Sequence, residues 1–247
     1  AEKLGLNHGA ALYPMVTVNG EECHNEWEIT FEEIHRNISM VMAIKKYIDY
    51  TDDFDYMHNM GIEIVVAIAR FWAQRVSFSN KHKKFVILGV TGPNEYENNV
   101  NNNWYTNYGA SWCLRYALKN LEIINESNIE NFNSFNFEKG ELDFWKKITE
   151  NMYYPFSEEH NLYMQDDGFE DKELIHVDEI PKRERPLNQN WSWDKILRSP
   201  YIKQGDFVQG IYYFEDEFSE EFIKNHFEFY EKYTVHESSL SASIHSV

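Results

Sequence analysis

The chain is poor in cysteine and has no long hydrophobic run. Its 247 residues include only two cysteines, Cys23 and Cys113, which excludes a disulfide framework and indicates a reducing compartment. No apolar segment approaches the roughly 20 residues that a helix needs to span a bilayer, and no signal peptide opens the sequence. We therefore expect a cytoplasmic protein that does not enter a membrane.

Basic residues are scarce relative to acidic ones. The sequence has 23 Lys and Arg against 41 Asp and Glu, a formal net charge of −18. Such a surface repels phosphate backbones and anionic lipids, so neither nucleic acid nor a membrane is an expected partner. Glycine loops of the nucleotide-binding type are missing, which disfavours ATP and NAD. No metal site is expected, because the histidines are scattered, among them His24, His35 and His58.

Apolar and aromatic residues are abundant. Hydrophobic residues make up 43% of the chain and aromatic residues 16%, enough for one large domain or a substantial part of one. These rings either fill a core or line a cleft in which sugar rings stack on them. The aromatic content is therefore compatible with a carbohydrate ligand but does not require one.

Apolar residues recur at helical spacing through most of the chain. Two helices are predicted near the start, over 30–49 with Thr30 as the N-cap and over 52–76, which Gly61 weakens in its middle. Further elements are predicted as helices over 104–124, 141–151, 203–214 and 219–231 and as a strand over 85–90.

Two segments lack this periodicity. Residues 125–140 and 153–190 are rich in Asn, Glu and Asp and are predicted as long loops. Long loops inside a compact domain are more often functional or inserted than idle. Long helices joined by such loops indicate an all-α toroid or bundle with one short β element.

The most informative segment is 89–103, which reads GVTGPNEYENNVNNN. A glycine-proline turn holds Glu95 on a defined backbone, and the asparagines that follow offer neutral hydrogen-bonding groups that suit a polyhydroxylated ligand. Glu95 is therefore the candidate acid that protonates a leaving oxygen in glycosidic cleavage, and a surface glutamate is the alternative. Glu97 is the nearest second carboxylate, but residues two apart in an extended loop point to opposite sides.

The segment YIKQGDF, residues 201–207, contains a second candidate pair. Lys203 and Gln204 are predicted to lie at the start of a helix, where free backbone N–H groups assist the binding of hydroxyls or an anion. An ordinary surface pair is the alternative.

The segment TVHESSLSASIHS, residues 234–246, contains the third candidate group. His236, Ser238 and Ser239 supply the imidazole and hydroxyl groups that can cradle an anion without many lysines. The segment has no Gly-x-Ser-x-Gly elbow, so it does not indicate a serine hydrolase. A solvated serine-rich loop is the alternative.

Together these segments support a family resemblance. Three segments of this chain resemble the glycoside phosphorylases of glycoside hydrolase family 65. In chain order they are GVTGPNEYENNVNNNWYTN, RPLNQNWSWDKILRSPYIKQGDFVQGIYYFEDEF and FYEKYTVHESSLSASIHS. The resemblance implies an all-α (α/α)₆ barrel, of which residues 1–247 form an incomplete part of the catalytic domain. The family's N-terminal β-sandwich, its glucose-binding Phe-Trp-Asp-Thr-Glu segment and its C-terminal β-domain are expected to be absent from this chain.

The resemblance also implies an activity. The expected reaction is the inverting phosphorolysis of maltose to glucose and β-D-glucose 1-phosphate. A sister phosphorylase acting on trehalose, kojibiose or nigerose, a hydrolase of the same fold, and an inactive carbohydrate-binding fragment are the alternatives. Inorganic phosphate is then a substrate, and no cofactor is expected. The resemblance also implies a homodimer as the expected assembly.

Individual residues take their roles from this resemblance. Glu95 matches the family's general acid, and Lys203 and Gln204 match its substrate-contacting pair. The residues that match the border of the phosphate site are His236, Ser238 and Ser239. Since phosphate itself attacks the anomeric carbon, no second carboxylate is needed as a base, and Glu97 is predicted not to be catalytic.

Overall fold

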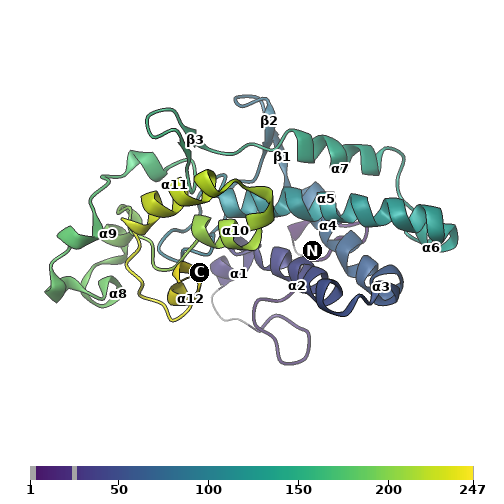
Figure 1. Ribbon diagram of the computed structural model, residues 1–247, viewed down its shortest axis with the longest axis horizontal. Coiled ribbons are helices and arrows are strands. Elements are labelled where there is room, and N and C mark those ends of the chain that lie inside the picture. The colour runs from purple at the N-terminus through teal and green to yellow at the C-terminus, as the bar shows by residue number, and fades with distance from the viewer. Residues whose placement is uncertain (1–3, 24–26, 247) are drawn as a thin grey trace. The chain divides into compact units, whose positions relative to one another are not determined.

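The computed structural model describes residues 4–23 and 27–246 (Figure 1). His24, one of the histidines considered above, lies outside the described residues. The expected all-α fold class is confirmed, because the described residues form mostly helices and two small two-stranded antiparallel sheets. The chain divides into two compact units, composed of Ala1–Asn25, Ile34–Ile87 and Asn107–Tyr153 and of Glu26–Glu33, Leu88–Thr106 and Tyr154–Val247.

The first unit contains helices α2 to α7 and one β-hairpin (Figure 1). Its helices are α2 (Arg36–Thr51), α3 (Phe54–Tyr56), a π-helical turn (Met57–Gly61), α4 (Ile62–Arg75), most of α5 (Trp104–Ser127), α6 (Ile129–Ser134) and α7 (Glu141–Glu150). The hairpin pairs β1 (Ser77–Ser79) with β2 (Lys84–Val86).

Apolar faces of the helices form the core of this unit. The fully or almost fully buried residues of α2 and α4 include Ile38, Val41, Ile44, Val65, Ile68, Phe71 and Trp72. Their spacing of three or four residues follows the helical repeat and produces one buried stripe on each helix. Gly109 of α5 faces Ile38, because a Cβ atom at Gly109 would lie 2.2 Å from Ile38 Cδ1. The missing side chain therefore lets α5 approach α2.

Three predictions for this part of the chain need correction. The single helix predicted over 30–49 is wrong, because α1 (Trp27–Glu32) ends and α2 begins at Arg36 while the apolar periodicity continues through the break. Thr30 is buried within α1 and is not an N-cap. The loop predicted over 125–140 contains α6, which buries none of its residues and so has no apolar periodicity to reveal it.

The remaining predictions for the first unit agree better with the structure. The helix over 52–76 is present from α3 to α4, and its weak middle is the π-helical turn that ends at Gly61. The helices over 104–124 and 141–151 correspond to α5 and α7. The strand over 85–90 is shorter than predicted, because β2 ends at Val86.

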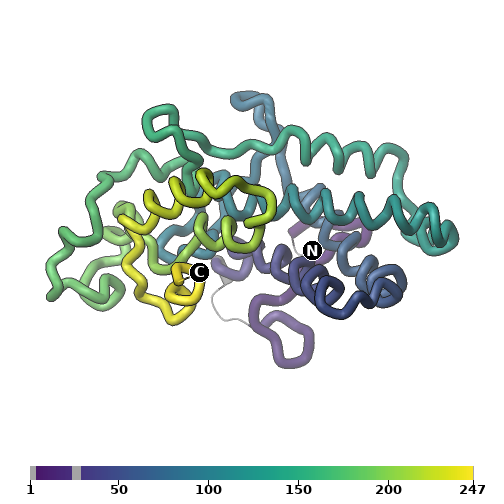
Figure 2. Tube along the Cα trace, viewed as in Figure 1, coloured from purple at the N-terminus to yellow at the C-terminus, as the bar shows by residue number. Residues whose placement is uncertain are grey.

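The second unit combines short helices with long irregular segments, which Figure 2 traces in green and yellow after residue 154. Its helices are α1, the first turn of α5, α8 (Leu187–Asn190), α9 (Trp193–Leu197), α10 (Phe207–Tyr213), α11 (Glu220–Glu231) and α12 (Ser241–His245). Short 3₁₀ turns cover Phe169–Asp171, Val177–Glu179, Lys182–Glu184 and Glu215–Glu217, and β3 (Phe156–Ser157) pairs with β4 (Leu162–Tyr163).

Stacked aromatic rings form the core of this unit. Phe207, the first residue of α10, stacks on Trp104 and Tyr230 with ring centroids 4.0 and 4.9 Å apart. Gly210, one turn later, packs so closely that a Cβ atom would lie 2.6 Å from Trp104. The start of α10 is therefore fixed by ring packing, and so is the segment that precedes it.

One predicted helix of this unit is wrong in its boundary, and with it the position of two candidate site residues. The helix over 203–214 begins only at Phe207, because Ile202 is bridged to Thr234 and the chain is irregular up to Asp206. Lys203 and Gln204 therefore precede the helix and do not lie at its start. The helix over 219–231 is confirmed as α11. The stretch over 153–190 is irregular apart from its short 3₁₀ turns, the β3–β4 hairpin and α8, which occupies its last four residues.

Candidate active site

A two-residue bridge closes the loop that contains Glu95. Val90 and Val100 exchange backbone hydrogen bonds of 2.9 and 2.8 Å. On α1, the Glu32 carboxylate accepts from the Thr91 hydroxyl at 2.7 Å and from the Asn99 N–H at 2.9 Å. The two ends of the loop are therefore fixed, and the residues between them are held on a closed backbone.

Glu95 is held by the two residues with which it was grouped from the sequence. Lys203 Nζ lies 2.6 Å from Glu95 Oε2, and Gln204 Nε2 donates to Glu95 Oε1 at 3.0 Å. The Glu95 side chain is 39% exposed, so a ligand can reach it from solvent. The structure thus brings Glu95 together with two predicted site residues that lie more than 100 positions further along the chain, and it places a donor on each carboxylate oxygen.

Asn94 ties the backbone of the same loop to the segment around Lys203. Its side-chain Oδ1 accepts from the backbone N–H groups of Lys203 at 2.9 Å and Tyr96 at 3.2 Å. Its own backbone N–H donates to Asp206 Oδ2 at 3.0 Å. Residues on both sides of Gln204 therefore hold the turn that precedes Glu95.

Asp206 is a buried carboxyl group that the sequence reasoning did not single out. It is 2% exposed, and burial raises its pKa to about 7 although the hydrogen bonds from Asn94 and Asn103 oppose that rise. A Cβ atom at Gly92 would lie 2.2 Å from Asp206 Oδ2 and 2.4 Å from Asn103 Nδ2. The glycine of the Gly-Pro turn is therefore required by this close approach.

Glu97 faces a separate buried cluster. Its carboxylate forms an ion pair with Lys172 and accepts from Gln165 Nε2 at 2.7 Å, and its side chain is 3% exposed. Burial alone would raise the pKa of Glu97, but the Lys172 ammonium and hydrogen bonds from Asp166 and Gln165 lower it overall. Burial and the neighbouring Glu97 charge raise the pKa of Asp166 well above its usual range.

The serine-rich segment lies beside Lys203 through backbone pairing. Val235 N–H donates to Ile202 O at 2.8 Å, and Glu237 N–H donates to Lys203 O at 3.0 Å. The Glu237 carboxylate accepts from the Tyr96 hydroxyl, one residue after Glu95, and from the Leu187 N–H. Glu237 therefore anchors the third predicted segment to the other two.

The three predicted phosphate-site residues lie on this anchored segment. His236 is exposed, with Nδ1 2.8 Å from the Ser241 hydroxyl and Nε2 3.1 Å from Glu231 Oε1. Ser238 is half-buried and accepts from the Leu240 N–H at 3.2 Å, and Ser239 is exposed. Their roles stay a prediction.

One group of side chains near this segment has the composition of a metal site. Glu231, His236 and His245 each place one ligand atom within 4.8 Å of the others. In the described geometry these atoms already satisfy one another, because His245 Nδ1 lies 2.5 Å from Glu231 Oε2 and His236 pairs with the other oxygen. The absence of a bound metal stays a prediction.

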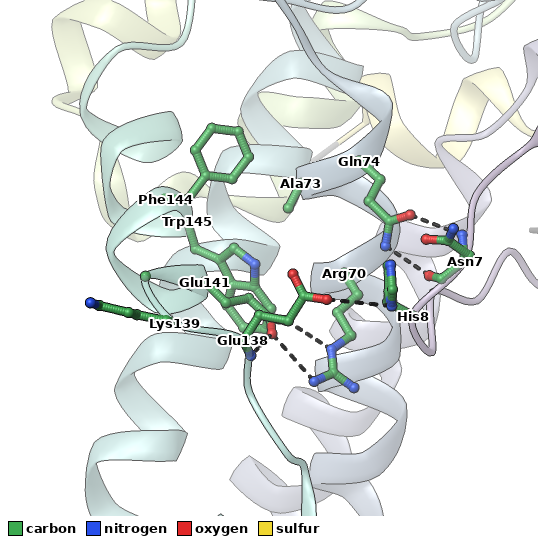
Figure 3. A pocket seen from close by; sticks show the side chains of 11 residues that line it. Asn7, His8, Arg70, Ala73, Gln74, Glu138, Lys139, Glu141, Phe144 and Trp145 are labelled. Atoms are coloured by element: carbon green, nitrogen blue, oxygen red, sulfur yellow. Dashed lines mark hydrogen bonds and ion pairs between the residues drawn. The ribbon is translucent and has the colours of Figure 1, made fainter.

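A pocket of about 320 Å³ in the first unit holds none of the predicted site residues (Figure 3). Figure 3 shows Arg70 facing Glu141, and Arg70 Nε donates to Glu141 Oε1 at 2.8 Å. His8, also on the pocket wall, lies 3.5 Å from Glu138. Arg70 and His8 each lie against an acidic side chain of the pocket wall. Because no predicted site residue lines this pocket, we place the candidate chemistry at Glu95 instead.

Sequence reasoning missed the residues that hold the site from behind. Asp206 and Glu237 both lie inside quoted segments, but each acts through a partner more than 100 positions away. Lys172 lies in a stretch predicted as loop, where no local pattern marks a buried cation. Among the described residues, no helix combines the length and the apolar composition that a bilayer crossing requires.

The mainly helical chain, with Glu95 held between a lysine and an amide, agrees with the glycoside-processing catalytic domain that the sequence resemblance implies. Comparison with protein families agrees: residues 1–247 match the glycosyl hydrolase family 65 central catalytic domain. The chain belongs to this family, as its sequence resemblance indicated.

Individual relatives show how far the similarity extends. The chain is 58% identical to the maltose phosphorylase of Bacillus subtilis (strain 168) over 100% of its own length and 32% of the relative. It is 36% identical to the alpha,alpha-trehalose phosphorylase of Thermoanaerobacter brockii over 98% of this chain and 32% of that protein. A solved putative kojibiose phosphorylase from human microbiome matches with a TM-score of 0.87 and 33% identity over 96% of this chain and 33% of that chain. The chain therefore spans about a third of the length of these relatives.

Proposed function

We propose that residues 1–247 are part of the catalytic barrel of a maltose phosphorylase, which converts maltose and phosphate to glucose and β-D-glucose 1-phosphate. The observation that carries the proposal is Glu95, whose two oxygens are held by Lys203 and Gln204 in a partly exposed position. The 58% identity to a maltose phosphorylase supports maltose over the disaccharides of the more distant relatives.

Substrate binding gives the Lys203–Gln204 pair a second use. Hydroxyls of a bound sugar can accept from Lys203 Nζ and Gln204 Nε2, which releases Glu95 from the donors that now hold it. Among the described residues, Gln204 Oε1 and Asn94 Nδ2 are buried without a hydrogen-bond partner, as expected beside a site that takes up a polar ligand. Glu95 is then the acid that protonates the leaving glycosidic oxygen.

Phosphate supplies the nucleophile in this reaction. A phosphate oxygen attacks the anomeric carbon opposite the leaving group, the bond from that carbon to the leaving oxygen breaks, and the configuration inverts. His236, Ser238 and Ser239 are the proposed border of the phosphate site, and the pairing of Glu237 with Lys203 supports their place near the sugar. No second carboxylate is needed as a base, because phosphate itself is the nucleophile. The buried ion pair of Glu97 with Lys172 supports a role of Glu97 outside this chemistry.

The test is phosphate-dependent glucose release from maltose by the full-length protein that carries these residues. Glu95→Gln keeps the shape of the side chain but cannot give up a proton, so we expect turnover to fall by at least about 10²-fold. Glu228→Gln is the matched control, because Glu228 is a glutamate on α11 that is 61% exposed. We expect this variant to turn over maltose at the parental rate. An unchanged rate for Glu95→Gln would reject the acid assignment.

The alternatives give different results in the same assay. Equal glucose release with and without phosphate would identify a hydrolase. Faster phosphorolysis of trehalose, kojibiose or nigerose would identify a sister phosphorylase. Binding of maltose without any glucose release would identify a non-catalytic carbohydrate-binding protein.

A further inference from the structure

A buried carboxylate lies directly behind the loop that contains Glu95. Asp206 Oδ2 accepts from the Asn94 N–H at 3.0 Å, and Asp206 Oδ1 accepts from Asn103 Nδ2 at 2.9 Å. Asp206 is 2% exposed, so substrate cannot touch it, and the proposed mechanism does not use it. A buried carboxyl group with two well-formed hydrogen bonds to the segment 89–103 calls for a role in that segment.

We infer that Asp206 is a positioning residue for phosphorolysis, which aims Glu95 at the leaving oxygen by holding the backbone of Asn94. The inference rests on the proposed function, since it assigns Asp206 an effect only through the acid. The inference predicts that replacing Asp206 strongly slows a reaction whose leaving group needs a proton from Glu95. The same replacement should slow a reaction without that need only slightly.

The geometry supports this role in two ways. Asp206 and the Lys203–Gln204 pair belong to one four-residue segment, so a single piece of chain holds both the backbone before Glu95 and the Glu95 carboxylate. The fit is also close, because Gly92 has no room for a Cβ atom beside Asp206 Oδ2. A small displacement of Asp206 would therefore move the turn and the acid together.

The chemistry of the side chain identifies the informative variant. Both partners of Asp206 are N–H donors, and a carboxylate can accept from both. Asp206→Asn has almost the same shape, but its NH₂ group would face one of these donors and repel it. The change therefore breaks one contact without opening a cavity.

The experiment compares two glucosyl donors in the full-length protein, each with inorganic phosphate. Maltose needs a proton on its leaving oxygen. With α-D-glucosyl fluoride, phosphate forms the new bond at the anomeric carbon, the carbon–fluorine bond breaks, and fluoride leaves as an anion that takes no proton from Glu95. A misplaced acid therefore slows the first reaction and largely spares the second.

We expect Asp206→Asn to lower kcat/KM for maltose at least about tenfold and that for α-D-glucosyl fluoride less than about threefold. Glu95→Gln should likewise lose more kcat/KM for maltose than for α-D-glucosyl fluoride. The difference between its two losses is the largest that an Asp206 variant can show. Asp167→Asn is the matched control, because Asp167 is exposed and accepts from Asn102 Nδ2 at 2.7 Å without touching Asn94. It should leave both rates unchanged.

Two results would overturn the inference. An equal loss on both donors would show that Asp206 only maintains the fold, and an unchanged rate on maltose would show that it has no role. If Asp206→Asn does not fold, Asp206→Glu keeps the carboxylate while shifting it by one methylene, and the same split is required of it. If the unaltered protein releases no glucose in a phosphate-dependent way, the proposed function itself fails. This result is obtained without the Asp206 variants, so it is distinct from a failure of the inference.

Discussion

Replacement of Lys172 by methionine tests whether Glu97 serves the fold and not the chemistry. The substitution keeps a long apolar side chain but removes the cation that pairs with Glu97, whose side chain is 3% exposed. Loss of one partner of a buried ion pair costs about 3–5 kcal/mol, because the remaining charge stays buried without compensation. The Lys172 side chain is 12% exposed, so we expect a loss near the lower end, about 3 kcal/mol.

The free energy of unfolding should depend on pH in a defined direction. The folded state lowers the pKa of Glu97, so the stability that Lys172 provides is complete above the unfolded value of about 4.3 and is lost as the pH falls through the lower, folded value. The penalty of Lys172→Met should therefore be largest at pH 7 and shrink below about pH 4.

Urea unfolding of the full-length protein, followed by far-ultraviolet circular dichroism, measures this penalty. Glu97→Gln and the double variant complete a mutant cycle, in which we expect a coupling energy of at least about 1 kcal/mol. Lys224→Met is the control, because Lys224 pairs with Glu228 at the surface, where their side chains are 70% and 61% exposed. This pair should contribute less than about 1 kcal/mol to the free energy of unfolding.

Two outcomes would refute the reasoning. A penalty for Lys172→Met no larger than that of the Lys224 control would show that the buried pair does not stabilise the fold. Loss of maltose phosphorolysis in Glu97→Gln, with the unfolding midpoint preserved, would show that Glu97 takes part in the reaction.

The remaining predictions concern two glycines. Gly92→Ala places a Cβ atom 2.2 Å from Asp206 Oδ2, so we expect maltose turnover to fall at least about tenfold, whereas Gly168→Ala, whose Cβ would meet Asp166 at 3.4 Å, should keep the parental rate. Gly109→Ala places a Cβ atom 2.2 Å from Ile38 Cδ1 and should destabilise the protein by about 1–3 kcal/mol in urea unfolding. Adding Ile38→Ala should cost less than the two single changes together, and strict additivity would contradict the contact.

Helices were predictable where one face is buried and hidden where none is. The apolar stripes of α4 and α11 identify both helices from the sequence, because burial selects residues at helical spacing. α6 buries no residue, so its sequence has no such stripe. The break between α1 and α2 contains neither proline nor glycine, so nothing local announces it.

The candidate site was predictable in the three residues that meet at the Glu95 carboxylate. Glu95, Lys203 and Gln204 could be singled out by residue type and by resemblance, and the structure brings their side chains together. Asp206 and Glu237 could not, because each is defined by a distant partner and a sequence shows no pairing over such separations.

The hydrogen bonds around Glu95 also have a consequence for how the protein folds. Contacts that join residue 94 to 206, 95 to 203 and 96 to 237 span 112, 108 and 141 positions, so each must close a long loop of chain before it forms. Helices form from neighbouring residues, whereas this network needs three remote segments at once. We therefore expect the acid to be the last part of the second unit to become ordered during refolding, so that recovery of activity lags behind recovery of helix content.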